Sequence, residues 1–90
     1  MTNRSVYCIS ITFRDDENNR FIHLGGAGWN TREEWNDEWN KIPSSRAGSC
    51  IVDKIDENGN IVEDRFVSIK TVESLLGGKL SQLIENGRRL

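Results

Sequence analysis

The stretch "LGGAGWNTREEWNDEWNKI", residues 24–42, decides the fold because it joins a glycine-rich run to a tryptophan-bearing helix. Thr31 and Glu34 have the Thr-x-x-Glu spacing of a capping box, which satisfies free backbone N–H groups at a helix start. Trp35, Trp39 and Ile42 then fall on one side of a helix with 3.6 residues per turn. The pattern predicts an amphipathic helix whose tryptophan side packs on a sheet, and which Pro43 ends.

The glycine run Gly25–Gly28 is open to two interpretations, a loop that grips phosphate or a turn that serves geometry. Gly26-Ala27-Gly28 supplies the first part of a dinucleotide fingerprint, but Thr31 stands where the third glycine belongs. Glycine also allows positive φ and close approach of backbones. We therefore expect a tight turn that docks the helix on the sheet.

Two hairpins flank this helix. Residues 6–13, "VYCISITF", alternate with strand period, and "FIHL" at residues 21–24 follows a polar turn as a short second strand. Residues 49–55 and 61–69 flank "DENGN", in which Asn58-Gly59 is a strong turn signal.

The tail, residues 71–90, has a helical pattern that Gly77-Gly78 interrupts. Its apolar stripe consists of Val72, Leu75, Leu76, Leu80, Leu83 and Ile84. If the small core does not cover this leucine stripe, we expect the stripe to be buried in a homodimer. The order of these elements over residues 1–90 predicts one α+β domain, β-β-α-β-β-α. In this domain an antiparallel sheet is covered by one or two helices.

Composition excludes several classes of protein. The chain has 90 residues, 36% of them hydrophobic and 29% charged, which is a globular mix. The net charge of −2 gives no general attraction to nucleic acid or anionic membrane. No apolar run approaches the ~20 residues of a membrane span, and no signal peptide is evident at the start, so we expect a cytoplasmic protein.

Catalytic and metal-binding patterns are weak. His23 is the only histidine and has no serine or cysteine at a diagnostic spacing, and no pair of carboxylates stands out. Cys8 and Cys50 lie in apolar strand patterns, which is typical of buried, reduced thiols, and these residues are too few for a zinc site. We predict no enzyme activity, no cofactor and no metal.

Two interpretations remain for the tryptophans. They fill the core beneath the helix, or part of the cluster is exposed and anchors a partner. The helix also carries four carboxylates, which would repel nucleic acid and would suit a basic groove built for phosphates. The predicted partner-binding residues are Trp29, Glu33, Glu34, Trp35, Asp37, Glu38 and Trp39.

The first half of the chain resembles domain-of-unknown-function family 3892, a family of small bacterial and phage proteins. The resemblance rests on Ile22, Leu24, Gly25, Gly26 and Trp29, within a strand–turn–strand–Gly-Gly–Trp order. It implies a bacterial or phage origin and no particular activity.

These observations predict a non-enzymatic protein-binding module that acts through the acidic, tryptophan-bearing helix. The proposed partner is a host protein complex, and the protein would be a phage or mobile-element inhibitor of a defence complex. The alternative is a small-ligand or nucleic-acid binding domain that uses the Gly25–Gly28 turn and the tryptophan cluster.

Overall fold

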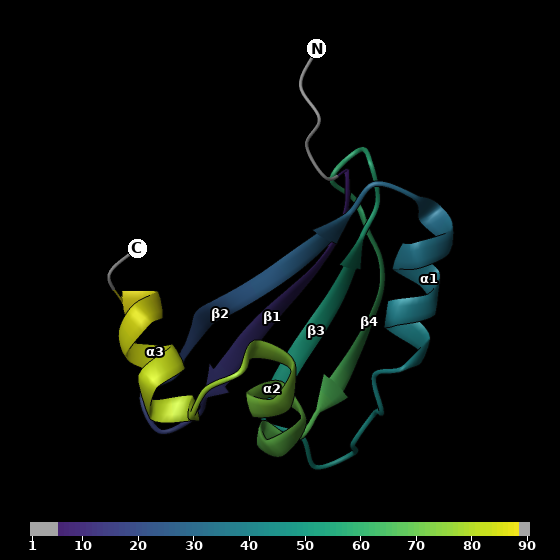
Figure 1. The fold of residues 1–90 in the computed structure, drawn as a ribbon. Helices are drawn as coiled ribbons and strands as arrows, with labels where there is room; N and C mark the ends of the chain where they lie inside the picture. The colour runs from purple at the N-terminus through teal and green to yellow at the C-terminus, as the bar shows by residue number, and fades with distance from the viewer. Residues whose placement is uncertain (1–5, 89–90) are drawn as a thin grey trace.

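The computed structural model describes residues 6–88 and has four strands and three helices (Figure 1). The predicted α+β class is confirmed, and the chain order is β-β-α-β-β-α-α. The elements are β1 (Tyr7–Asp15), β2 (Arg20–Trp29), α1 (Arg32–Asn40), β3 (Cys50–Ile55), β4 (Ile61–Val67), α2 (Ile69–Leu76) and α3 (Leu80–Arg88).

The four strands form one antiparallel sheet in the order β2-β1-β3-β4. Its centre is the pairing of β1 with β3, which places Ile11 opposite Val52. Because alternate side chains of a strand point to opposite faces, this register assigns every residue of the sheet to one of two sides.

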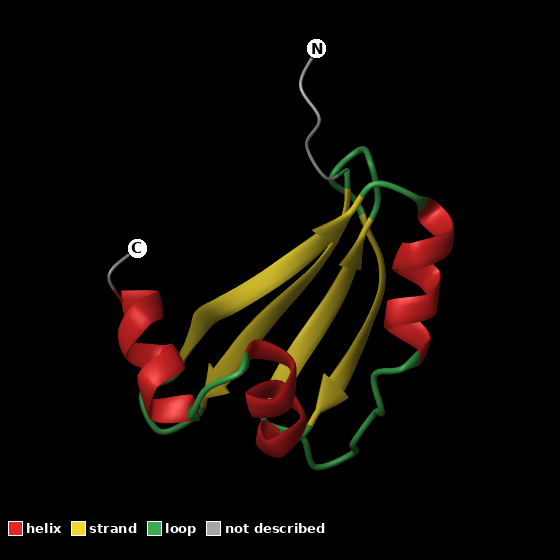
Figure 2. Ribbon diagram, in the orientation of Figure 1, coloured by secondary structure: helices red, strands yellow, loops and turns green. Residues whose placement is uncertain are grey.

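All three helices pack on the same face of the sheet (Figure 2). Each helix contributes to one hydrophobic cluster, which also contains the inward side chains of all four strands. Its buried members are Ile9, Ile11, Ile22, Leu24, Trp35, Trp39, Ile42, Cys50, Val52, Val67, Val72 and Leu83. The fold therefore has two layers, and the opposite face of the sheet points away from the helices.

Helix α1 begins as its sequence predicts. The Thr31 hydroxyl accepts a hydrogen bond from the Glu34 backbone N–H at 3.2 Å and donates one to the Glu34 carboxylate at 2.9 Å. The Trp35 indole N–H donates to the carbonyl oxygen of Cys8 at 2.9 Å. This bond fixes the helix to β1, and the Lys54 ammonium lies 4.6 Å from the centre of the Trp35 ring.

Trp39 is the second anchor of α1 and is only 1% exposed. The guanidinium carbon of Arg65 lies 4.3 Å from the Trp39 ring centre, and Arg65 Nη1 donates to the Ile42 carbonyl oxygen at 2.6 Å. Arg65 Nη2 also bonds Glu63 at 3.0 Å. Strand β4 thus holds the end of α1 through a charged side chain as well as through apolar contact.

The glycine run does not form the predicted turn, because β2 continues through it to Trp29. Gly25 has a φ of +151° beside a bulge, where the pairing with β1 shifts between Ile11 and Thr12. A Cβ on Gly26 would lie 2.5 Å from the Ile9 carbonyl oxygen. The glycines therefore serve geometry inside a strand, where they permit the bulge and a close approach of β1.

The second half of the chain departs most from its expected boundaries where β4 meets α2. Strand β4 ends at Val67 instead of reaching Ile69, because the Ser68 hydroxyl accepts the Thr71 backbone N–H and starts α2. The predicted interruption at Gly77-Gly78 is confirmed: Gly77 ends α2 with a left-handed φ of +73°. None of the helices in the described residues is both long enough and apolar enough to cross a bilayer.

Candidate interaction surface

The side of the sheet that points away from the helices is called here the open face. On the open face β1 presents Cys8, Ser10 and Thr12, which alternate with the core residues Ile9 and Ile11. Several large apolar side chains of the open face are exposed, including Phe21 at 68%, Val62 at 52% and Phe66 at 42%. The apolar members of the open face are Val6, Phe21, Ile51, Ile55, Ile61, Val62 and Phe66, with Ile61 placed on it by its pairing with Ile55 at the bulge.

A polar row crosses the open face between these apolar groups. The Ser10 hydroxyl lies 3.3 Å from His23 Nδ1 on β2, and Ser10 pairs with Asp53 on β3. Asp53 in turn pairs with Asp64 on β4. On one side of the row Ile51 pairs with Phe66; on the other side lie Ile55, Ile61 and Val62.

Asp53 and Asp64 bring two carboxylates together on neighbouring strands. Within residues 6–88 neither side chain has a hydrogen bond or an ion pair. Partial burial raises the pKa of Asp53, and the charge of Asp64 raises it further. Because neither carboxylate has a partner among these residues, the centre of the open face carries an uncompensated negative charge. Like charges directly opposite each other also destabilise a strand pair.

The Ser10–His23 pair does not form a nucleophile–base–acid arrangement. In a serine–histidine–aspartate triad the carboxylate bonds the second ring nitrogen of the histidine, whereas Asp53 lies on the far side of Ser10, one strand further from His23. No carboxylate hydrogen-bonds His23 in the part of the chain that the structure describes. The geometry gives these residues a polar contact surface and no oriented base.

The structure separates the residues predicted to bind a partner. Trp35 and Trp39 are 3% and 1% exposed, so they belong to the core and are not available as surface anchors. The interpretation that they fill the space beneath the helix is the one that fits. The carboxylates of α1 remain on the surface: Glu33, Glu34 and Asp37 are exposed residues, and the Glu38 side chain is 43% exposed.

The remaining predicted residues, Trp29 and Glu38, line a small cavity between the sheet and the helices α1 and α2. The cavity measures about 170 Å³. It is lined by Ile9, Ile11, Gly26, Ala27, Trp29, Glu38, Ile42, Leu75 and Leu76. Its polar atoms are few, and the Glu38 carboxylate at its rim is paired with Lys41 at 3.1 Å. The cavity offers apolar contact and little to orient a polar ligand.

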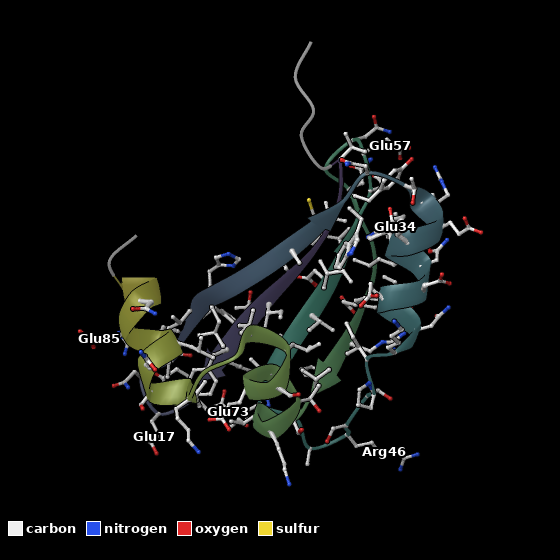
Figure 3. The ribbon with its side chains drawn as sticks, in the orientation of Figure 1. Glu17, Glu34, Arg46, Glu57, Glu73 and Glu85 are labelled. Atoms are coloured by element: carbon white, nitrogen blue, oxygen red, sulfur yellow. The ribbon has the colours of Figure 1, made fainter. Side chains whose placement is uncertain are left out.

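The start of α1 is tied to the tip of the β3–β4 hairpin, where Figure 3 labels Glu57. The Glu57 carboxylate accepts hydrogen bonds from the Tyr7 hydroxyl at 3.0 Å and from Arg32 at 3.1 Å. The centres of the Tyr7 and Trp35 rings lie 4.9 Å apart. This end of the molecule is therefore cross-linked by side chains from β1, α1 and the hairpin.

The leucine stripe of the tail is largely covered by the protein's own sheet. Val72 and Leu83 are buried, and Leu76, Leu80 and Ile84 pack against the core. Leu75 alone among these six residues is exposed, at 47%. The fold thus removes the reason given above for a homodimer through this stripe.

The two cysteines occupy different environments. Cys50 is fully buried on the helix side of the sheet, and burial raises its pKa to about 11. Cys8 is half-buried and on the open face, beside a shallow hollow that Ser10, His23 and Gly26 also line. The two thiols are both free.

Sequence reasoning missed the open face as a candidate site. The signal was present in the alternation of residues 6–13, whose second set is Val6, Cys8, Ser10 and Thr12. The observation that Val62 and Phe66 have the opposite parity to Val67 was a second signal. Neither pattern says which face the helices cover, so the exposure of one set became visible only in the assembled fold.

Within the described residues, no three His, Cys, Asp or Glu side chains gather in a way that could hold a metal ion. Comparisons with known protein families, curated proteins and solved structures find no match to this chain. The resemblance of the first half to domain-of-unknown-function family 3892 therefore stays a prediction, carried by the Gly25-Gly26 pair and Trp29.

Proposed function

We propose that this chain is a non-enzymatic protein-binding module whose contact surface is the open face of the sheet. The observation that carries the proposal is the exposure of Phe21, Val62 and Phe66 on the face opposite the helices. Large aromatic and aliphatic side chains on one face are typical of surfaces that become buried in a complex. The apolar side chains on the other face of the sheet are already covered by the three helices.

A site-specific photocrosslinker tests this surface directly. We would place benzoylphenylalanine at position 66 in one variant and at position 33, on α1, in a matched control. Irradiation in bacterial cells is expected to give a discrete adduct from position 66, and the substitutions Phe21→Ser and Val62→Ser are expected to remove it. Adducts from position 33 with none from position 66 would contradict the proposal.

The acidic surface of α1 supports a second candidate within the same class. Glu33 and Asp37 are exposed, and neither has an ion pair or a side-chain hydrogen bond in the described part of the chain. Carboxylates spaced along a helix suit a basic groove that normally binds phosphates. On this proposal the protein is a phage or mobile-element inhibitor of a host defence complex.

Charge-neutral variants separate the two candidates. Glu33→Gln with Asp37→Asn removes two charges from α1 and leaves the open face intact. If α1 carries the contact, this variant releases the partner in a pull-down from bacterial lysate, and the release follows added salt. If the open face carries it, the α1 variant retains the partner and Phe66→Ser releases it.

A further inference from the structure

Asp53 and Asp64 form an acidic centre within the apolar part of the open face. They lie directly opposite each other on β3 and β4, where facing β-carbons are about 5 Å apart. On the open face the next pair to one side is Ile51 with Phe66, and the next pair to the other side is Ile55 with Ile61. A partner that covers the apolar groups must therefore also cover both carboxylates.

The cations nearest in sequence to this centre are committed elsewhere. Lys54 and Arg65 are the chain neighbours of Asp53 and Asp64, but alternation turns them to the helix side. There the Lys54 ammonium bonds Asn36 at 2.5 Å, and Arg65 bonds the end of α1.

Among the described residues, one more cation lies near these apolar groups, and it is also engaged. Arg14 lies 5.2 Å from the centre of the Phe66 ring and pairs with Asp16 at 3.3 Å. No described basic side chain thus forms an ion pair with Asp53 or Asp64.

We infer that the open face binds a protein segment that places one lysine or arginine over the Asp53–Asp64 pair and apolar side chains on both sides of it. The inference rests on the proposed function and names the chemistry of the partner. Covering an unpaired carboxylate with apolar groups alone is unfavourable, whereas a cation held between two carboxylates compensates both charges.

The same charge pattern argues against other occupants of the open face. Nucleic acid and anionic lipid bring negative charge to an acidic centre. A second copy stacked face to face would bring another pair of aspartates to the same region, and like charges brought together cost free energy. A basic protein segment is the occupant that the charges favour.

A random peptide library displayed on phage provides the probe, with the intact chain as bait. The test variants are Asp53→Asn with Asp64→Asn, which keep the side-chain shape and remove both charges. Phe21→Ser with Phe66→Ser removes apolar contact, and Glu33→Gln with Asp37→Asn is the control with an equal change of charge away from the face. Circular dichroism checks that each variant is folded.

Selected peptides are expected to contain one lysine or arginine between apolar residues. Their affinity is expected to fall about tenfold on the Asp53→Asn, Asp64→Asn variant and to stay unchanged on the α1 control. Replacing the basic residue of a peptide by norleucine should cause a similar loss, and the two losses should not add.

Other outcomes overturn the inference in distinguishable ways. Peptides that depend on Phe21 and Phe66 but bind the asparagine variant equally well would refute the cation and leave the proposed function standing. Peptides that ignore both phenylalanines, or a selection that yields none, would overturn the proposed function as well. Self-association of the wild-type chain that Phe66→Ser abolishes would assign the face to a second copy.

Discussion

Asp53 and Asp64 face each other across the β3–β4 pairing, and the described part of the chain supplies neither with an ion pair. This relationship turns an apolar sheet surface into one with a defined electrostatic centre. It makes the pH dependence of stability informative about the same residues that are proposed to meet a partner.

The free energy of unfolding should depend on the protonation of Asp53. Its pKa is raised in the folded chain, so the folded state keeps the proton at a pH where the unfolded chain has lost it. The contribution to stability is therefore fully present below the unfolded pKa and is lost as the pH rises through the raised value. Asp53→Asn should be about 0.5 kcal/mol more stable than wild type at neutral pH and equal to it near about pH 3.

Urea titrations over this pH range measure the difference between the two proteins. Asp37→Asn, an exposed change on α1, is the control and should show no such pH-dependent difference. A difference between wild type and Asp53→Asn that stays constant with pH would contradict the assignment to Asp53.

Trp39 should be the most costly of the tryptophans to remove. It is 1% exposed and contacts both the core and Arg65. Trp39→Ala should lower the free energy of unfolding by about 3–5 kcal/mol, through lost burial and the cavity that remains. Trp29→Ala, at a half-buried position beside the existing cavity, should cost clearly less. Equal losses in denaturant titrations would contradict the buried position of Trp39.

Gly26 should tolerate no larger residue without a shift of the backbone. An added Cβ would lie 2.5 Å from the Ile9 carbonyl oxygen, which belongs to a central strand and has little freedom to move. Gly26→Ala should therefore destabilise the protein by about 1–3 kcal/mol. Gly59→Ala is a useful comparison, because its Cβ would meet nothing within 4 Å and only its φ of +83° opposes the change. Thermal melts of both variants and the wild type measure the two effects separately.

Arg65 should not be replaceable by lysine. Its guanidinium bonds the Ile42 carbonyl oxygen and Glu63 while lying over Trp39, and an ammonium group lacks the planar fork for this combination. Arg65→Lys should lower stability by about 1–2 kcal/mol. Arg46→Lys, at an exposed loop position, should leave stability unchanged. A neutral effect of Arg65→Lys in urea titrations would mean that only the charge at this position matters.

The sequence predicted the elements well where one local signal dominates. Thr31 and Gly77 act through the backbone of their own turn, so the start of α1 and the break between α2 and α3 were readable. The end of α1 was predicted less well, because the helix stops at Asn40, before Ile42 and Pro43. The end of β2 could not be predicted in this way. Gly25–Gly28 are compatible with a turn, and they become a strand only through pairing with β1.

The candidate site was less predictable, for a physical reason. Whether a tryptophan is buried or exposed depends on what the other elements cover, and the pattern of Trp35 and Trp39 fits both cases. The facing of Asp53 and Asp64 depends on the register of the β3–β4 hairpin, which the bulge beside Ile55 shifts. Such relationships between strands have no signature in the spacing along one strand.

The placement of the two thiols on opposite faces gives the unmodified protein a built-in reporter. With a pKa of about 11, Cys50 is ionised to roughly one part in a thousand at mildly alkaline pH, and its burial also shields it from reagents. Cys8 is the accessible thiol, beside Ser10 and His23. Alkylation with iodoacetamide should therefore tag Cys8 selectively, and a bound macromolecule that shields this side of the sheet would slow the tagging without any engineered residue.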